Sequence, residues 1–163
     1  MDNSTMTKRK LSIQFLVALT SLALLSALSL SPANAASKSK NLSASNLVTI
    51  SYQLSVTIPK SGCGKIPVKY KINKLPLDGS AFFVVIEDDQ DRLIGQAEWF
   101  GEDYEGSVKA MPKTGTFNIK VCRSMWTDTD ENTFYPAYKG TYTIYLSAIG
   151  DMSADAKGSF KLS

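Results

Sequence analysis

The 163-residue sequence contains no histidine. This absence excludes Ser-His-Asp and Cys-His catalysis, histidine-ligated zinc and the commonest general base near neutral pH. The chain has only two cysteines, which excludes a four-cysteine metal centre, and it lacks the phosphate-binding motifs G-x-x-x-x-G-K-[ST] and G-x-G-x-x-G. Carboxylate pairs of the glycosidase type stay open, but no pattern selects a pair from Glu87, Glu98, Glu102 and Glu105. We therefore predict that the protein is not an enzyme.

Long apolar runs are absent beyond the N-terminus. There, basic residues at 8–10 precede an uncharged apolar stretch over 11–30, and Ala33 and Ala35 form an A-x-A site. This order is typical of a Sec-type signal peptide, so we predict that residues 1–35 are cleaved and that the protein is secreted, periplasmic or on the envelope exterior. The apolar run of about 20 residues is long enough to span a bilayer, so a retained anchor is the alternative. After cleavage we expect no membrane span.

The net positive charge of the remaining residues is small. Without residues 1–35 the chain has 15 basic and 14 acidic residues, too small a surplus for a general nucleic-acid binder, so no nucleic-acid partner is expected. The charges are also unevenly distributed. Residues 36–74 contain seven lysines and no acid, whereas residues 75–105 contain nine acids and one arginine. We expect neighbouring strands whose opposite charges pair on a solvated face; the alternative is two different faces and a strong dipole.

Apolar and polar residues alternate over 47–58, with apolar side chains at every even position from Val48 to Ile58. A period of two predicts a strand. Pro67 cannot donate to a ladder, so the strand over 65–72 is expected at a sheet edge. Residues 81–87, apolar except for Glu87, are expected at a sheet centre. Weaker or shorter patterns predict further strands at 92–99, 104–110, 115–121, 140–146 and 156–162.

These segments predict an all-β fold. We expect one antiparallel β-sandwich domain of about seven or eight strands over 47–163, after a flexible leader over 36–46. The pattern resembles the broad immunoglobulin and fibronectin type III architecture. Cys63 lies just after the first strand and residues 81–87 lack a tryptophan, so a jelly roll or a small barrel is the alternative. Cys63 and Cys122 are predicted to form a structural disulfide, as two cysteines in an exported protein usually do.

One stretch, CRSMWTDTDENTFYPAY at 122–138, interrupts the strands with a connection of about 15 residues. Its large side chains are costly to leave in water, so we do not expect disorder. We expect Met125 and Phe134 to pack on the end of the core, and Trp126, Tyr135 and Tyr138 to face outward as binding residues. The alternative is that all of them cap the core.

The same loop carries acidic side chains. Asp128, Asp130 and Glu131 are predicted as polar contacts to a ligand. Asp128, Asp130 and Asn132 also begin like an EF-hand, which makes calcium the one cofactor to consider, although the glycine and the glutamate that an EF-hand needs are missing. A second acidic cluster lies at 87–91. A solvated polar turn is the alternative for both clusters.

Together these features predict an exported, non-catalytic binding module. It would engage an extracellular or envelope polymer, or a protein partner, through the loop over 123–138. One alternative is a structural or assembly subunit of an envelope or extracellular complex, which would use its strand edges and opposed charges. Another is a secreted enzyme inhibitor that presents the loop to its target.

Overall fold

A computed structural model describes residues 38–106 and 111–163 of the protein. Within these ranges the chain forms β-strands and one short 3-10 turn, η1 (Tyr104–Gly106), so the prediction of an all-β fold is confirmed. In this part of the chain there is no helix long and apolar enough to cross a membrane. The predicted signal peptide, residues 1–35, lies outside the described residues.

The strands form two main sheets. Sheet A has the order β1-β2-β4-β7 and is antiparallel throughout. Its strands are β1 (Ser39–Ala44), β2 (Val48–Gln53), β4 (Cys63–Ile72) and β7 (Thr114–Cys122).

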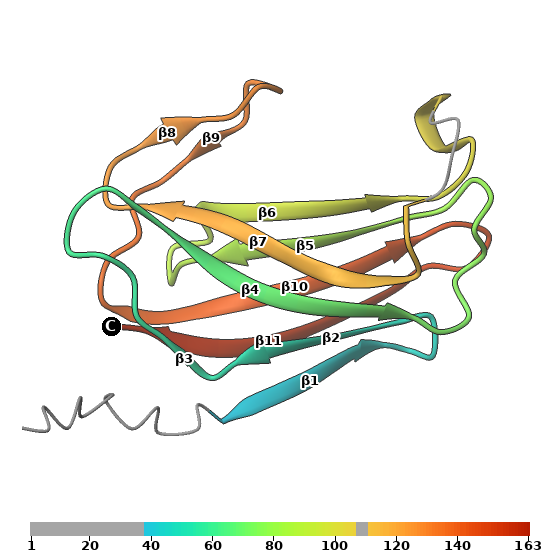
Figure 1. Ribbon diagram of the computed structural model, residues 1–163, viewed down its shortest axis with the longest axis horizontal. Helices are drawn as coiled ribbons and strands as arrows, with labels where there is room; N and C mark the ends of the chain where they lie inside the picture. The colour runs from blue at the N-terminus through green and yellow to red at the C-terminus, as the bar shows by residue number, and fades with distance from the viewer. Residues whose placement is uncertain (1–37, 107–110) are drawn as a thin grey trace, which may run out of the picture. The chain divides into compact units, whose positions relative to one another are not determined.

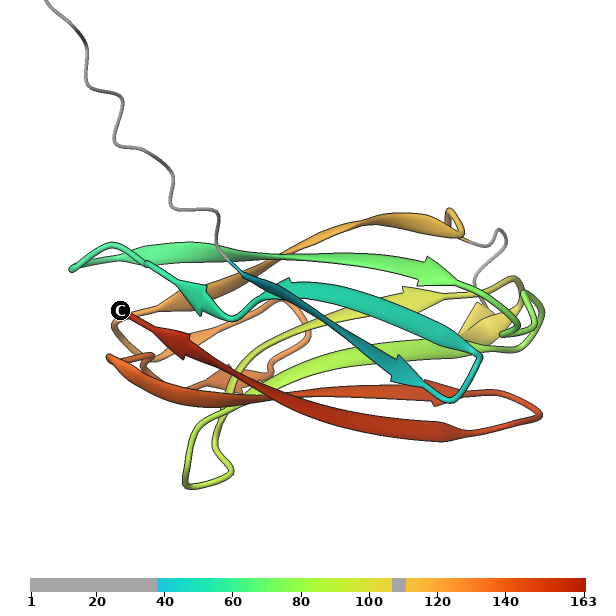
Figure 2. The same cartoon turned by 90° about the horizontal axis from the view of Figure 1, so that it is seen from below.

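Sheet B has the order β3-β11-β10-β5-β6, with only the β3–β11 pair parallel. Figure 2 shows β4 and β7 of sheet A on one side and β10 and β11 of sheet B on the other. The sheets also approach at both edges, where β7 lies beside β6 and β1 beside β11 (Figure 1). The strands of sheet B are β3 (Ser55–Val56), β5 (Ala81–Glu87), β6 (Leu93–Phe100), β10 (Gly140–Ile149) and β11 (Ala154–Leu162).

The core lies between the two sheets and is built from the alternate residues that the period of two selects. Phe82 of β5 lies at the centre of an aromatic cluster, stacked on Trp99 and in contact with Tyr70 and Phe117 of sheet A. The buried indole of Trp99 donates a hydrogen bond to the carbonyl of Pro112 at 3.0 Å, so its polar atom is satisfied. The sequence of residues 81–87 has no tryptophan. The core tryptophan of this fold lies instead on the neighbouring strand β6.

Four expectations about the strands are wrong. The described part of the strand predicted over 104–110 forms the 3-10 turn η1 instead. The described part of the predicted leader contains β1, which pairs with β2 from Ser39 to Ala44. The strand with Pro67 is not at an edge, because β4 lies between β2 and β7. Its ladder to β2 ends at the Tyr52–Val68 pair, so Pro67 itself has no partner on β2. The alternating segment 47–58 is not one strand either: beyond Leu54 the chain leaves sheet A and continues as β3 in sheet B.

The predicted disulfide between Cys63 and Cys122 is confirmed. The two cysteines are directly opposite each other on neighbouring strands of sheet A, unlike the inter-sheet disulfide of antibody domains. A disulfide is consistent with an extracellular or periplasmic location.

The uneven charge distribution becomes a difference between the sheets. The lysine-rich segment supplies β1, β2 and β4 of sheet A, and the acidic segment supplies β5 and β6 of sheet B. Over the described ranges there is one ion pair, Asp88 with Arg92, and both partners come from the acidic segment. The expected pairing of charges between the two segments is therefore wrong, and the alternative of two different faces agrees with the structure.

Candidate functional site

The loop over 123–138 folds into a small hairpin of β8 (Trp126–Thr127) and β9 (Thr133–Phe134). Figure 1 shows the hairpin rising from the end of β7 and standing above β6, with β9 beside β6. At the turn, Glu131 adopts a left-handed backbone conformation, with φ at 63°. The connection is therefore ordered and protrudes from the fold.

Hydrogen bonds hold the base of this hairpin. Arg123, next to the disulfide, donates its backbone N–H to Gly62 and its side chain to the carbonyls of Pro59 and Ala137, each at 2.9 Å. Ala137 donates its N–H to the Cys122 carbonyl at 2.7 Å. The two ends of the loop are thus joined to each other and to the segment before β4, which limits hinge motion at the base.

Trp126 lies within the hairpin's own packing. Its ring stacks on Phe134 at 4.2 Å between centroids, and the Lys120 ammonium lies 4.1 Å from the same ring. Two groups this close to one ring centroid cannot share a face, so neither face of the indole is open to a ligand. Its Nε1–H is buried with no acceptor among the described residues. Phe134 is buried as expected, but Met125 is 56% exposed, so its predicted place in the core is wrong.

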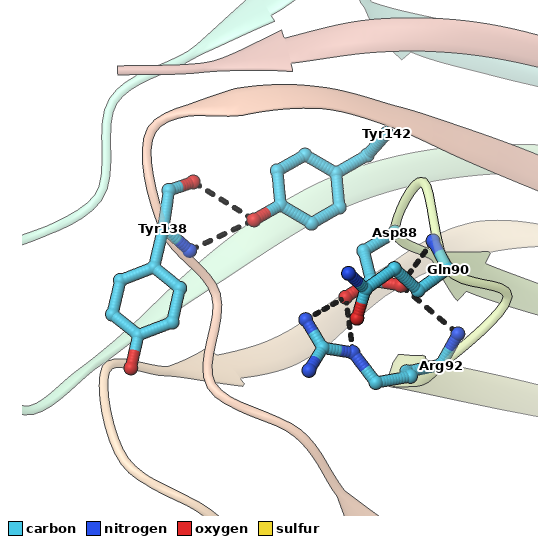
Figure 3. Close-up of polar contacts among 5 residues, drawn as sticks. All are labelled: Asp88, Gln90, Arg92, Tyr138 and Tyr142. Carbon is cyan, nitrogen blue, oxygen red and sulfur yellow. Dashed lines mark hydrogen bonds and ion pairs between the residues drawn. The ribbon is translucent and has the colours of Figure 1, made fainter.

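Tyr135 and Tyr138 are both exposed, as predicted, and Tyr138 is the more so at 58%. The Tyr138 backbone is fixed at both polar groups: its N–H donates to the Tyr142 hydroxyl and its carbonyl accepts from that hydroxyl, each at 2.8 Å (Figure 3). Burial raises the pKa of Tyr142 above its ordinary value, so the hydroxyl stays protonated and able to donate. The phenol ring of Tyr138 points away from this clamp.

The predicted metal ligands Asp128, Asp130 and Asn132 lie at the hairpin turn. One Asp128 oxygen accepts the N–H groups of Asp130 and Asn132 at 3.0 and 2.9 Å, and the other accepts the Asn132 side-chain amide at 3.0 Å. The hydrogen bond from the Asn132 amide is the main cause that lowers the pKa of Asp128. The Asp128 carboxylate is thus engaged within its own turn, and within 38–106 and 111–163 no group of three His, Cys, Asp or Glu side chains is placed to hold a metal ion.

The second acidic cluster is organised around Asp88, which is only 8% exposed. Its carboxylate accepts the N–H groups of Gln90 and Arg92 and pairs with the Arg92 guanidinium at 2.6 Å (Figure 3). Burial opposes ionisation of Asp88, but these bonds and the charge of Arg92 outweigh it and lower its pKa. Arg92 also lies over the Tyr135 ring, with its guanidinium carbon 5.3 Å from the centroid.

The tyrosine-rich base of the loop and the Asp88 turn meet around a hollow of about 140 Å³. Of the predicted binding residues, only Tyr138 lines it. Sequence reasoning missed Arg92, although a single arginine within an acidic segment was a visible signal. We call this surface, with the adjoining Tyr135, the tyrosine site. The residues that line the hollow are Asp88, Asp89, Arg92, Pro136, Tyr138, Lys139, Gly140, Thr141 and Tyr142.

No protein-family model, curated protein or solved structure matches this chain. The chemistry of the tyrosine site consists of an exposed aromatic ring, a fixed guanidinium–carboxylate pair and nearby hydroxyl and ammonium groups. Such groups bind by stacking, hydrogen bonding and charge. Because Asp88 is held ionised by Arg92, it is poorly suited to donate a proton as a general acid.

Proposed function

We propose that this protein is an exported, non-catalytic binding module that engages a surface polysaccharide through the tyrosine site. The observation that carries the proposal is Tyr138, an exposed ring whose backbone is fixed by two hydrogen bonds beside a polar hollow. A residue whose backbone is already fixed loses less freedom on binding, so more of the contact energy appears as affinity. A flat phenol suits the apolar face of a sugar ring, and the hydroxyl, ammonium and carboxylate groups around it suit sugar hydroxyls.

The size of the hollow favours one unit of a polymer over an enclosed small molecule. Sites that enclose a free ligand are typically about 300–1,000 Å³. This hollow, at about 140 Å³, is smaller and has room for one ring or side group. The rest of the ligand would lie across the exposed tyrosines.

The proposal also includes export of the protein and the architecture of its fold. The basic, apolar and A-x-A pattern of residues 1–35 supports a cleaved signal peptide, and the disulfide agrees with export. We place the fold with the β-sandwiches of immunoglobulin-like or fibronectin type III-like architecture, supported by two facing sheets with antiparallel neighbours.

A second candidate function, a subunit of an envelope or extracellular assembly, rests on the outer face of sheet B. Phe100 there stacks on Tyr104 at 5.4 Å and meets Phe83 edge-on at 6.2 Å. Val85 and Tyr145 extend this apolar strip, and Ile149 is 41% exposed. Apolar patches of this kind often mark protein contacts. Concentration-dependent self-association in sedimentation velocity, abolished by Phe100→Ser, would favour this candidate.

The proposed function is tested by co-sedimentation of the protein, produced from its full-length sequence in an exporting host, with insoluble cellulose, chitin and bacterial cell-wall preparations. Tyr138→Ala is the test variant. Met152→Ala is the matched control, because it also removes a large side chain that is about half exposed, at 54%, but in the turn between β10 and β11.

We expect the wild type and Met152→Ala to pellet with at least one polymer, and folded Tyr138→Ala to remain in solution. Equal sedimentation of the two variants, or no sedimentation of the wild type, would contradict the proposal. Parallel lanes with calcium and with EDTA test the calcium prediction, since a metal-dependent site loses binding in EDTA.

A further inference from the structure

The outer face of sheet A has an unusual composition. Two rows of side chains cross all four strands: Ser43, Thr49, Lys71 and Thr114, and Asn41, Ser51, Lys69 and Thr116. Beyond the end of the β2–β4 ladder the face continues with the pairs Ser39–Gln53, Pro67–Asn118 and Lys65–Lys120. The residues of this face are exposed or half-buried, while their neighbours along β2 and β4 are mostly buried. Apart from Pro67 and the Cys63–Cys122 disulfide beside Lys65 and Lys120, every position carries a hydroxyl, an amide or a lysine ammonium, and none is acidic.

The lysines of this face have no anionic partner in the described part of the chain. Lys65 and Lys120 are directly opposite each other on β4 and β7, an arrangement of like charges that destabilises a sheet. Lys69 and Lys71 continue the positive charge along β4 toward the other end of the face. An anion that binds here would relieve this repulsion.

A hollow of about 170 Å³ lies within this face, lined by Ser39, Ser51, Tyr52, Gln53, Pro67 and Lys69. It lies where the β2–β4 ladder stops at Tyr52–Val68 and the chain moves on to sheet B as β3. The side chains of Ser39, Ser51 and Gln53 make no hydrogen bond to other described residues. Their donors and acceptors are therefore available to a ligand.

We propose that the outer face of sheet A is a second binding surface, which takes an acidic polysaccharide. Lys65, Lys69 and Lys71 bind its carboxylates or sulfates along β4. The hollow holds one sugar unit against Pro67, with Ser51 and Gln53 bonding its hydroxyls. This surface is formed by other strands than the tyrosine site and does not depend on it.

The chemistry of the face favours an acidic polysaccharide over two other anionic partners. A single-stranded nucleic acid needs open aromatic rings for its bases to stack on. The ring beside this face, Trp126, is covered by Lys120 and Phe134. A second copy of the protein would offer Glu87, Glu98 and Asp155, but on a sheet whose outer face also carries Phe83 and Phe100. Apart from Pro67 and the disulfide at one end, the polar face of sheet A has no apolar side chain to cover those rings.

The test measures binding of fluorescently labelled dextran sulfate and polygalacturonate to the full-length gene product by anisotropy, with uncharged dextran as the polymer control. The test variant is Lys69→Gln/Lys71→Gln. The matched control is Lys157→Gln/Lys161→Gln, which removes the same charge from exposed positions of β11 in sheet B. A third variant, Ser51→Ala/Gln53→Ala, tests the hollow with all the lysines kept.

We expect both acidic polymers to bind at about 50 mM salt and to weaken as salt rises, and dextran not to bind. Lys69→Gln/Lys71→Gln should bind at least about tenfold more weakly and should lower the slope of log affinity against log salt by about two. The Lys157→Gln/Lys161→Gln protein should bind like the wild type. Ser51→Ala/Gln53→Ala should lose about threefold to tenfold with an unchanged salt slope.

Four results would overturn the proposal. Equal losses in the two lysine variants would show a response to net charge alone, and dextran binding would show that the anionic groups are not recognised. Tighter binding of a labelled single-stranded oligonucleotide would reassign the face to nucleic acid. Self-association that is lost in Lys69→Gln/Lys71→Gln would reassign it to a second copy. Tyr138→Ala should bind both acidic polymers normally, so failure of the tyrosine site and failure of this surface are distinguishable.

Discussion

Replacement of Tyr142 by phenylalanine tests whether the structure presents Tyr138 in a fixed position. The change removes only the hydroxyl, which both accepts from the Tyr138 N–H and donates to its carbonyl at 2.8 Å. A neutral hydrogen bond contributes about 1 kcal/mol net, so the free energy of unfolding should fall by about 2 kcal/mol. The corresponding decrease in Tm is roughly 5–10 °C for a domain of this size.

The assay is urea unfolding together with hydrogen exchange at the Tyr138 amide. Tyr145→Phe is the control, because it removes the same atom from another position on β10 that is only half-buried. We expect faster exchange at the Tyr138 amide in Tyr142→Phe, and weaker polysaccharide binding although Tyr138 itself is intact. An unfolding free energy within about 0.5 kcal/mol of wild type, with unchanged exchange, would show that the clamp does not exist as described.

Two further predictions concern the disulfide and the Asp88 turn. Replacement of both Cys63 and Cys122, 59 residues apart, by serine should lower the free energy of unfolding by about 4 kcal/mol through loop entropy, as measured by urea unfolding; a loss below about 1 kcal/mol would contradict this reasoning. The lowered pKa of Asp88 adds stability above its ordinary pKa of 3.8, and this contribution is lost as pH falls through the lower folded value. Acid titration of unfolding should therefore show a smaller pH dependence below about pH 4 in Asp88→Asn than in the wild type, and identical curves would refute the role of this carboxylate.

Much of the fold follows from local sequence patterns. The alternation in 65–72 predicted the buried and exposed sides of β4 correctly, because successive residues of a strand point to opposite faces. The opposing cysteines were predictable from their number and the expected compartment. By contrast, β1 is mostly polar and exposed, so it gives no alternation signal; its ladder to β2 is what makes it a strand.

The candidate site was predicted only in part, because the type of a residue does not determine which side chains pack against it. Tyr138 and Trp126 were both predicted as binding aromatics. In the structure Phe134 and Lys120 cover the Trp126 ring, whereas the Tyr138 side chain is exposed. Asp128 was predicted as a cation ligand, but backbone N–H groups of its own turn engage one of its oxygens and the Asn132 side-chain amide engages the other. Arg92 reaches the site through a turn that lies more than 40 residues from Tyr138 in sequence, a proximity that no local pattern encodes.

By itself, the sequence determined what chemistry is excluded and which side chains are buried in the strands that alternate, because composition and a period of two are local properties. Only the tertiary structure decided which strands are neighbours. That choice places the lysines of β4 and β7 on one face without acids, moves the chain to the other sheet after Leu54, and brings Asp88 and Arg92 beside Tyr138. The physical reason is that strand order and sheet exchange depend on packing and backbone pairing between distant segments, which the pattern within any one strand does not specify.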